Sequence, residues 1–416
     1  MRRTILGVFA VVCFAVSPAL LSAQEKFVPN YDEAKVPAYT LPDPLVMQDG
    51  TKVTTSDVWE KSRRPELVEL FAREMFGPVP ANSGKLTWSV LEEDEKALEG
   101  TAHRIQIELK PDGDGGDRRF ELLLYIPNQV KGPVPVFINF NFLGNHTVHP
   151  DPAIHVATWR SRDPKTGEAV VLTSEIARGD RIRRFPIEVI LKRGYALATV
   201  HYQAVYPDDA KAVKIPEGSE AGAISHWAWG YSRVTDVLSQ LPKIDREKIV
   251  FLGHSRLGKT ALWAGANDPR AAIVISNDSG CGGASLARRQ YGETVGRIND
   301  AFPHWFCGNY KKYGNDVNQL PFDAHELLSL TAPRPVYVAS ATEDQWADPK
   351  GEFLALLNAN PVYQLYGLEG IRETEQPAPE KPISAHNGYH LRVGKHDLLE
   401  YDWVRYLDFA DGYFKK

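Results

Sequence analysis

A short apolar strand that ends at a glycine-flanked serine constrains the fold of this chain more than any other feature. The run Ile249–Leu252 leads directly into the heptapeptide Gly253–Lys259, with Ser255 near its centre, and an alanine-rich stretch follows. A buried strand that turns sharply at a serine and enters a helix predicts a nucleophile elbow, which raises the hydroxyl above the sheet edge. The N-terminus of the helix behind it offers free backbone N–H groups to an oxyanion.

The glycine spacing departs from the usual elbow. The chain has Gly-X-Ser-X-X-Gly in place of Gly-X-Ser-X-Gly, so only the first half of the pattern matches. The alternative is a serine that merely caps the helix, a position that serine often occupies. We favour the nucleophile, and the rest of the chain strengthens that interpretation.

From residue 134 onward, short apolar runs alternate with helical patterns. Helices are predicted over His226–Leu241, Lys259–Ala266 and Leu398–Asp411. Such alternation predicts an α/β fold, a three-layer sandwich with a mainly parallel central sheet whose active site lies at the carboxyl ends of the strands. The predicted strands are Val134–Phe142, Tyr195–Val200, Ile249–Leu252, Ile273–Ser276, Val336–Ala341 and Val362–Leu365.

The N-terminal part has a different pattern. Residues 24–60 are proline-rich and predict the extended beginning of an arm (24–100) that wraps the core, and Glu66–Phe76 is helical in pattern. The segments Leu86–Leu109 and Phe120–Ile126 alternate as strands do, and the turn-forming residues 111–117 lie between them. We expect antiparallel edge strands here, within one domain that spans residues 24–416.

The first 23 residues have the pattern of a secretory signal peptide. Met1-Arg2-Arg3 is basic, residues 5–16 are apolar, and the small residues before a cut after Ala23 suit a signal peptidase. A membrane anchor is the alternative, but the apolar stretch is short for a bilayer. We expect an exported protein, periplasmic or secreted, with no membrane partner.

The composition argues against several classes of partner and cofactor. The formal net charge is −5 with both signs mixed along the chain, which argues against nucleic acid and anionic membrane surfaces. No CxxC, HExxH or histidine cluster at ligand spacing is present, so neither a metal nor another cofactor is expected. After the signal peptide only Cys281 and Cys307 remain, and whether they pair is left open.

An activated serine needs a base, and the base needs an acid that orients it. In α/β-hydrolases the chain order is serine, acid, histidine. His396 lies in the expected place, after the last predicted strand and before the final helix. Two acids qualify, because Asp344 follows the Val336–Ala341 strand and Asp278 follows the strand after the elbow helix.

The heptapeptide Gly-His-Ser-Arg-Leu-Gly-Lys resembles the signature of the glucuronoyl esterases, carbohydrate esterase family fifteen, and the bacterial branch resembles this chain more than the fungal one. The resemblance implies an α/β-hydrolase fold and a serine carboxylic-ester hydrolase. Further matching segments are Asn139–Thr147, Trp227–Arg233, Ser279–Ala284, Arg288–Glu293, Phe302–Phe306, Trp346–Pro349 and His396–Trp403.

The resemblance also implies roles for individual residues. Ser255 matches the nucleophile, His396 the base and Arg256 the arginine at the oxyanion hole, where a fixed charge stabilises charge that forms only in the transition state. The residues implied to hold the uronate ring are Lys259, Glu293 and Trp346.

The chain departs from the fungal members in two respects. Asp278 stands where they have a glutamate, so we expect Asp344 to be the main acid with Asp278 in support. His254 and Asp397 stand where they have cysteines, so the disulfide between the two catalytic loops is absent.

The expected activity is hydrolysis of the ester between 4-O-methyl-glucuronic acid of glucuronoxylan and lignin alcohols, and we expect a monomer. Two alternatives stay open. An acetyl or feruloyl esterase on xylan shares the catalytic residues but not the ring contacts, and fold alone does not separate the two. A catalytically silent glycan-binding protein is the alternative of another class, against which Ser255, Arg256 and His396 argue.

Overall fold

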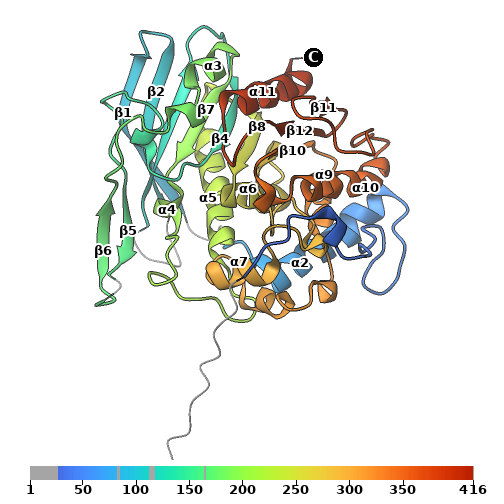
Figure 1. The fold of residues 1–416 in the computed structure, drawn as a ribbon. Coiled ribbons are helices and arrows are strands. Elements are labelled where there is room, and N and C mark those ends of the chain that lie inside the picture. The colour runs from blue at the N-terminus through green and yellow to red at the C-terminus, as the bar shows by residue number, and fades with distance from the viewer. Residues whose placement is uncertain (1–26, 82–84, 112–117, 164, 416) are drawn as a thin grey trace, which may run out of the picture.

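The computed structural model describes residues 27–81, 85–111, 118–163 and 165–415, and a ten-stranded sheet forms its centre (Figure 1). The expected signal peptide and residues 112–117 of the predicted turn lie outside this part of the chain. The sheet has the order β1-β2-β3-β7-β4-β8-β9-β10-β12-β11, and β5 and β6 form a separate hairpin. The strands are β1 (Leu86–Ala97), β2 (Ala102–Pro111), β3 (Phe120–Pro127), β4 (Val134–Asn139), β5 (Thr158–Arg162), β6 (Ala169–Thr173), β7 (Ala196–Val200), β8 (Ile244–His254), β9 (Ala271–Asn277), β10 (Val336–Ala341), β11 (Ile383–Ser384) and β12 (Gly388–Arg392).

The sheet is antiparallel at one end and parallel through its centre. Three neighbouring pairs are antiparallel, namely β1–β2, β2–β3 and β3–β7, which confirms the expected antiparallel strands. From β7 through β4, β8, β9 and β10 to β12, every neighbouring pair is parallel. The carboxyl ends of these six strands therefore share one edge, which positions the loops that follow them.

Helices cover both faces of the sheet, as the alternation of side chains along each strand requires. On β8, Phe251 packs in the core cluster that includes residues of α5 and α6, whereas Val250 packs in the cluster that includes residues of α3 and α11. This confirms the predicted three-layer sandwich. The helices are α1 (Ser56–Val58), α2 (Arg64–Phe71), α3 (Ile187–Lys192), α4 (Tyr202–Val205), α5 (Ala223–Leu238), α6 (Arg256–Asn267), α7 (Val295–Ala301), α8 (Ala324–Ser329), α9 (Pro349–Asn358), α10 (Asn360–Gln364) and α11 (Glu400–Phe414).

One predicted strand was wrong. Val362–Leu365 is not a strand, because residues 360–364 form the short helix α10, with Pro361 in its first turn. Proline at the start of a helix is favourable, and a short apolar run does not by itself distinguish a buried helix from a buried strand. The strand that precedes His396 is β12, whose five residues are all buried.

Cys281 and Cys307 are both buried and both free, so the pairing left open by the sequence does not form. Among the described residues, none of the helices has the length and apolar character needed to cross a membrane.

Candidate active site

Ser255 occupies a strained turn between β8 and α6. Its backbone has φ 59° and ψ −128°, a region that residues other than glycine rarely adopt, and its N–H donates to the carbonyl oxygen of Asn277 at 2.9 Å. A Cβ at Gly253 would lie 1.8 Å from the carbonyl oxygen of Leu257, and one at Gly258 would lie 2.9 Å from the Cβ of Ser279. The glycine spacing of the motif thus follows from how closely this turn packs against its neighbours.

A single cavity of about 340 Å³ brings together every residue that the sequence singled out for the site. It opens at the carboxyl edge of the sheet, where the loops after β8, β9, β10 and β12 meet. Phe302 and Trp305 also line it. The eight expected residues in its wall are Ser255, Arg256, Lys259, Asp278, Glu293, Asp344, Trp346 and His396.

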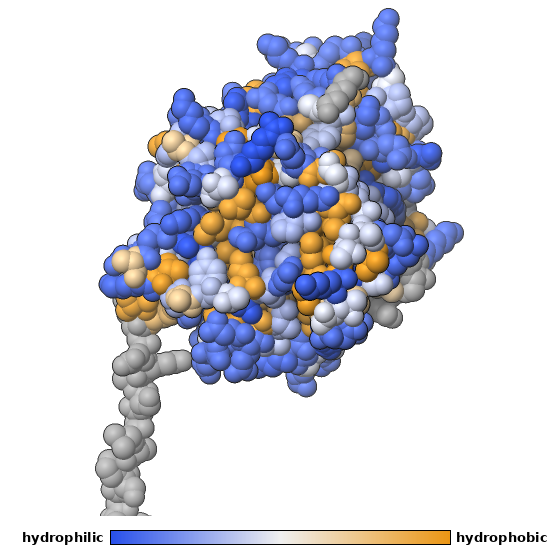
Figure 2. All heavy atoms as spheres, turned by 90° about the vertical axis from the view of Figure 1, so that its right-hand side faces the viewer, coloured by the Kyte–Doolittle hydropathy of each residue, from blue (hydrophilic) through white to orange (hydrophobic). Residues whose placement is uncertain are grey.

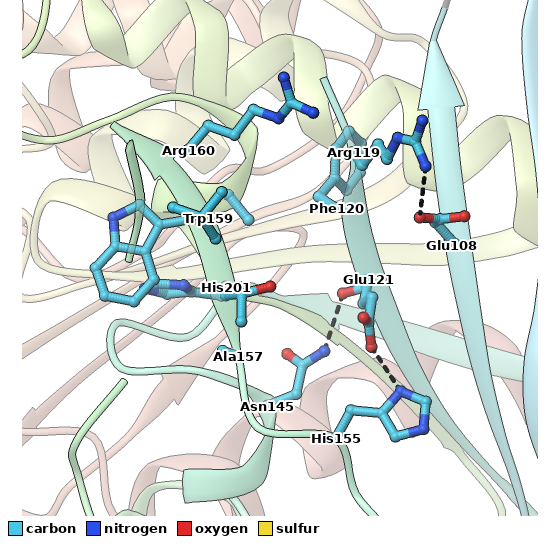
Figure 3. Close-up of a pocket in the computed structure, with 13 residues that line it drawn as sticks. Glu108, Arg119, Phe120, Glu121, Asn145, His155, Ala157, Trp159, Arg160 and His201 are labelled. Atoms are coloured by element: carbon cyan, nitrogen blue, oxygen red, sulfur yellow. Dashed lines mark hydrogen bonds and ion pairs between the residues drawn. The ribbon is translucent and has the colours of Figure 1, made fainter. Parts of the chain in front are cut away.

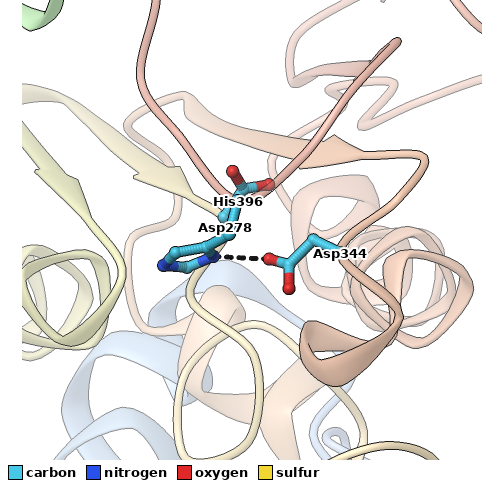
Figure 4. A group of neighbouring side chains, drawn as sticks. All are labelled: Asp278, Asp344 and His396. Carbon is cyan, nitrogen blue, oxygen red and sulfur yellow. Dashed lines mark hydrogen bonds and ion pairs between the residues drawn. The ribbon is translucent and has the colours of Figure 1, made fainter.

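His396 and Asp344 form a close pair in this cavity. Nδ1 of His396 lies 2.6 Å from Oδ2 of Asp344 (Figure 4). The two residues follow the parallel neighbours β12 and β10, which brings their loops together. Asp344 is buried, whereas the imidazole of His396 is 41% exposed and faces the cavity. This is the arrangement in which a carboxylate fixes the tautomer of a catalytic base.

Asp278 lies beside this pair but makes its contacts elsewhere. Its Oδ2 accepts a long hydrogen bond of 3.4 Å from the backbone N–H of Asp397 and lies 3.8 Å from a guanidinium nitrogen of Arg392. Burial, and then the neighbouring Asp344 carboxylate, raise the pKa of Asp278 well above its usual value. Asp278 is therefore suited to hold a proton, while Asp344 contacts the histidine.

Arg256 is fixed in place by a buried carboxylate. Its Nη1 forms an ion pair with Asp208, and its guanidinium carbon lies 4.6 Å from the ring centre of Trp305. Asp208 also accepts hydrogen bonds from Nε2 of His304 at 2.8 Å and from Nε1 of Trp305 at 2.7 Å. Burial disfavours its charge, but these donors and Arg256 together lower its pKa below the usual value. Asp208 is thus an anion that orients Arg256 towards the cavity.

Reasoning from the sequence missed Asp208. Asp208 follows α4 and lies 48 residues before Arg256, so no local pattern connects the two. The available signal was the segment Phe302–Phe306, whose His304 and Trp305 meet at this carboxylate.

Lys259, Glu293 and Trp346 also line the cavity. The ammonium of Lys259 donates to the carbonyl oxygen of Ser279, and burial lowers its pKa. Burial raises the pKa of Glu293, although the nearby Lys259 ammonium and a hydrogen bond from Trp346 act in the opposite direction. The indole is 36% exposed. A cation, a carboxyl group and an aromatic face together can bind a hydroxylated ring.

In the described part of the chain, packing and polar contacts rather than a disulfide join the loops that carry Ser255 and His396. The buried imidazole of His254 packs against that of His396, with ring centres 4.5 Å apart. Nδ2 of Asn277 donates to the carbonyl oxygen of Asp397 at 3.2 Å, and Asp397 pairs with Arg184 at 2.6 Å. Packing and hydrogen bonds therefore position the histidine loop beside the elbow.

The N-terminal arm also reaches this site, a role that the sequence did not predict. The ring of Phe27 meets that of Trp346 edge-on, with ring centres 6.0 Å apart. The N–H of Gly292, next to Glu293, donates to the carbonyl oxygen of Asn30 at 2.9 Å. The arm therefore supports the two loops that carry Glu293 and Trp346.

Comparisons with known proteins identify the family of this chain. The family model described as "Glucuronyl esterase, fungi" matches residues 214–367, a segment that contains the elbow and Asp344. A carbohydrate esterase from an unknown prokaryotic organism is 45% identical over 92% of this chain and 91% of its own length. A 4-O-methyl-glucuronoyl methylesterase of Wolfiporia cocos is 27% identical over 86% of this chain and 82% of its own length.

Solved structures give the same result. A promiscuous CE15 esterase from a marine bacterial metagenome superposes with a TM-score of 0.85 at 45% identity and covers 92% of this chain and 99% of its own. A glucuronoyl esterase from Solibacter usitatus has the same TM-score at 42% identity and covers 92% and 100%. The fold is accordingly that of the α/β-hydrolases, and the chain belongs to carbohydrate esterase family fifteen, the glucuronoyl esterases, which are carboxylic-ester hydrolases.

Proposed function

We propose that this protein is an exported serine esterase that hydrolyses the ester between 4-O-methyl-glucuronic acid of glucuronoxylan and a lignin alcohol. The observation that carries the proposal is one cavity that is lined by the His396–Asp344 pair, Ser255 and Arg256 and also by a cation, a carboxyl group and an indole. The names of the relatives from Wolfiporia cocos and Solibacter usitatus support the substrate class.

The residues divide the reaction between them. Oγ of Ser255 attacks the ester carbonyl carbon while Nε2 of His396 takes its proton, and Asp344 stabilises the imidazolium through Nδ1. The tetrahedral oxyanion forms beside Arg256, whose charge is held in place by Asp208. Collapse breaks the bond to the alcohol, which leaves with the proton from His396.

Water completes the cycle. It attacks the acyl-enzyme as His396 takes one of its protons, and Ser255 leaves with that proton when the free uronic acid is released. In the ground state, Lys259, Glu293 and Trp346 hold the uronate ring so that its ester carbonyl lies near the serine.

A comparison of wild type with Ser255→Ala distinguishes a serine esterase from a catalytically silent glycan-binding protein. The substitution removes only a hydroxyl at the sheet edge, so we expect hydrolysis of benzyl glucuronate to be abolished while the thermal unfolding curve is kept. Binding of glucuronoxylan to the variant, measured by calorimetry, should persist. Hydrolysis at the wild-type rate in Ser255→Ala would exclude the serine mechanism.

A further inference from the structure

A second cavity lies between the β5–β6 hairpin and the body of the protein. Its volume is about 170 Å³, and it shares no lining residue with the cavity of Ser255. Figure 3 shows the indole of Trp159 on one side and the pair formed by Glu121 and His155 on the other. The proposed mechanism gives these side chains no role.

This cavity lies at the same edge of the sheet as the catalytic one. Its lining residues Asn145 and His201 come from the segments that follow β4 and β7, and Ser255 follows β8. The three strands are neighbours in the order β7-β4-β8. Neighbouring strands lie about 4.8 Å apart, so the strands that precede His201 and Ser255 are roughly 10 Å apart, about two strand spacings.

Packing connects the two cavities through a thin layer of side chains. Trp159 meets His201 edge-on with ring centres 4.8 Å apart, and Nε2 of His201 lies 3.2 Å from the carbonyl oxygen of Phe142. The ring of Phe142 lies in turn 5.9 Å from the guanidinium carbon of Arg256. Only a few packed side chains therefore lie between the two cavities.

The polar lining suits hydroxyl groups better than a charged ligand. Two carboxylates, Glu108 and Glu121, are balanced by two guanidinium groups, Arg119 and Arg160, so the cavity has no net charge that would select an anion. Oε2 of Glu121 lies 3.0 Å from Nδ1 of His155. Carboxylates accept hydrogen bonds from sugar hydroxyls, while guanidinium groups donate to them.

One ring nitrogen of His201, a residue in the wall of this cavity, has no hydrogen-bond partner among the described residues. Its side chain is buried, and burial lowers its pKa to about 3, so the ring is neutral at ordinary pH. With Nε2 donating to Phe142, Nδ1 carries a lone pair and has no hydrogen-bond partner among the described atoms. A buried polar atom normally has a partner.

We infer that the cavity beneath the β5–β6 hairpin is a second carbohydrate subsite, which binds a neutral pyranose of the polysaccharide whose uronate ester is cleaved at Ser255. The indole of Trp159 packs against the sugar ring, and Glu121 accepts hydrogen bonds from its hydroxyls. This inference rests on the proposed function for the identity of the polysaccharide, but the binding step requires no esterase activity.

Direct binding separates the subsite from catalysis. A neutral xylo-oligosaccharide of six units, with no uronate and no ester, is titrated into the Ser255→Ala protein by calorimetry. Adding Trp159→Ala should weaken binding about tenfold, which corresponds to about 1.4 kcal/mol. Adding Glu121→Gln, which keeps the size of the side chain, should also weaken it. The matched control is Trp88→Ala on β1, a half-buried tryptophan outside both cavities, and it should leave binding unchanged.

Kinetics on two substrates provide a second test. In the active enzyme, Trp159→Ala should lower the ratio of kcat/KM on a polymeric glucuronoxylan ester to kcat/KM on benzyl glucuronate by about tenfold. Equal losses on both substrates would show that the substitution acts only through packing and would overturn the subsite. Unchanged oligosaccharide binding in both pocket variants would overturn it too. A pocket that binds a free aromatic alcohol in preference to the oligosaccharide would also contradict the inference.

Discussion

Nδ1 of His396 lies 2.6 Å from Oδ2 of Asp344, whereas the nearby carboxyl group of Asp278 makes its contacts with Asp397 and Arg392. One ring nitrogen of His396 and one carboxyl oxygen of each aspartate all lie within 4.8 Å of one another. Burial and the charge of Asp344 raise the pKa of Asp278, which favours its protonated form. The two acids thus have different roles in one cluster.

Replacing each acid with its amide should separate these roles. Asp344→Asn should lower kcat/KM on benzyl glucuronate by several orders of magnitude, about 10⁴-fold as in a serine triad, because the amide favours the wrong imidazole tautomer. Asp278→Asn, the matched control, should cost far less, since its neutral form resembles the amide. The assignment is reversed if Asp278→Asn proves the more damaging change.

Arg256 should act mainly in the transition state. Arg256→Ala should lower kcat by about a hundredfold or more and leave KM nearly unchanged, as removal of an oxyanion donor does. Steady-state kinetics on benzyl glucuronate measure both constants. A raised KM with an unchanged kcat would instead mean that Arg256 binds the substrate in its ground state.

Asp208 should affect kcat, because it holds Arg256 in position. Asp208→Asn removes the negative charge that fixes the guanidinium, so kcat should fall by about ten- to hundredfold with little change in KM. Tyr202→Phe, which removes a single hydrogen bond of 2.6 Å to Asp208, is the milder control and should cost less. If both variants raise KM alone, Asp208 shapes the binding wall and does not position the charge.

The features that could be predicted from the sequence are those that neighbouring residues along the chain determine. The turn at Ser255 was predictable because its glycines and the strand and helix around it are contiguous, and the alternation of apolar runs predicted the parallel sheet. The chain order placed His396 and both acids at one edge of that sheet. Sequence order does not give side-chain direction, so the expectation that Asp344 is the main acid could be checked only in the structure, where Asp344 contacts His396.

What the sequence did not predict depends on distant contacts. The ion pair of Arg256 with Asp208 and the edge-on packing of Phe27 against Trp346 join segments with no shared pattern. The error at Val362–Leu365 had a local cause, since this run of four residues, three of them apolar, fits a strand and a short helix equally well. In the folded protein residues 362–364 of this segment are part of the helix α10, with Val362 and Tyr363 buried.

Glu352, beneath the catalytic loops, should make stability depend on pH. Oε1 accepts a hydrogen bond from the N–H of Gly280 at 2.9 Å, Oε2 accepts one from Ser340 at 2.6 Å, and burial raises its pKa to about 8. The unfolded carboxyl group titrates near 4.5. The folded state therefore binds more protons between these values, so this contribution is complete below 4.5 and is lost as pH rises through 8.

Glu352→Gln keeps a neutral side chain of the same size and should flatten this dependence. The slope that it removes is at most about 1.4 kcal/mol per pH unit. Chemical denaturation at several pH values from 5 to 8 measures it, and Glu375→Gln, at an exposed site, should leave the profile unchanged. An identical slope in wild type and Glu352→Gln would rule out this residue as the source.

The rate ratio between matched esters tests the proposed substrate most directly. A site that hydrogen-bonds ring hydroxyls penalises an analogue whose 4-hydroxyl points the other way, by about 1–3 kcal/mol for each buried group left unpaired. The wild-type enzyme should therefore hydrolyse benzyl glucuronate with a kcat/KM at least about tenfold above that for benzyl galacturonate. It should hydrolyse acetylated xylan more slowly than the glucuronate ester. Faster turnover of acetylated xylan than of any glucuronate ester would contradict the proposed substrate.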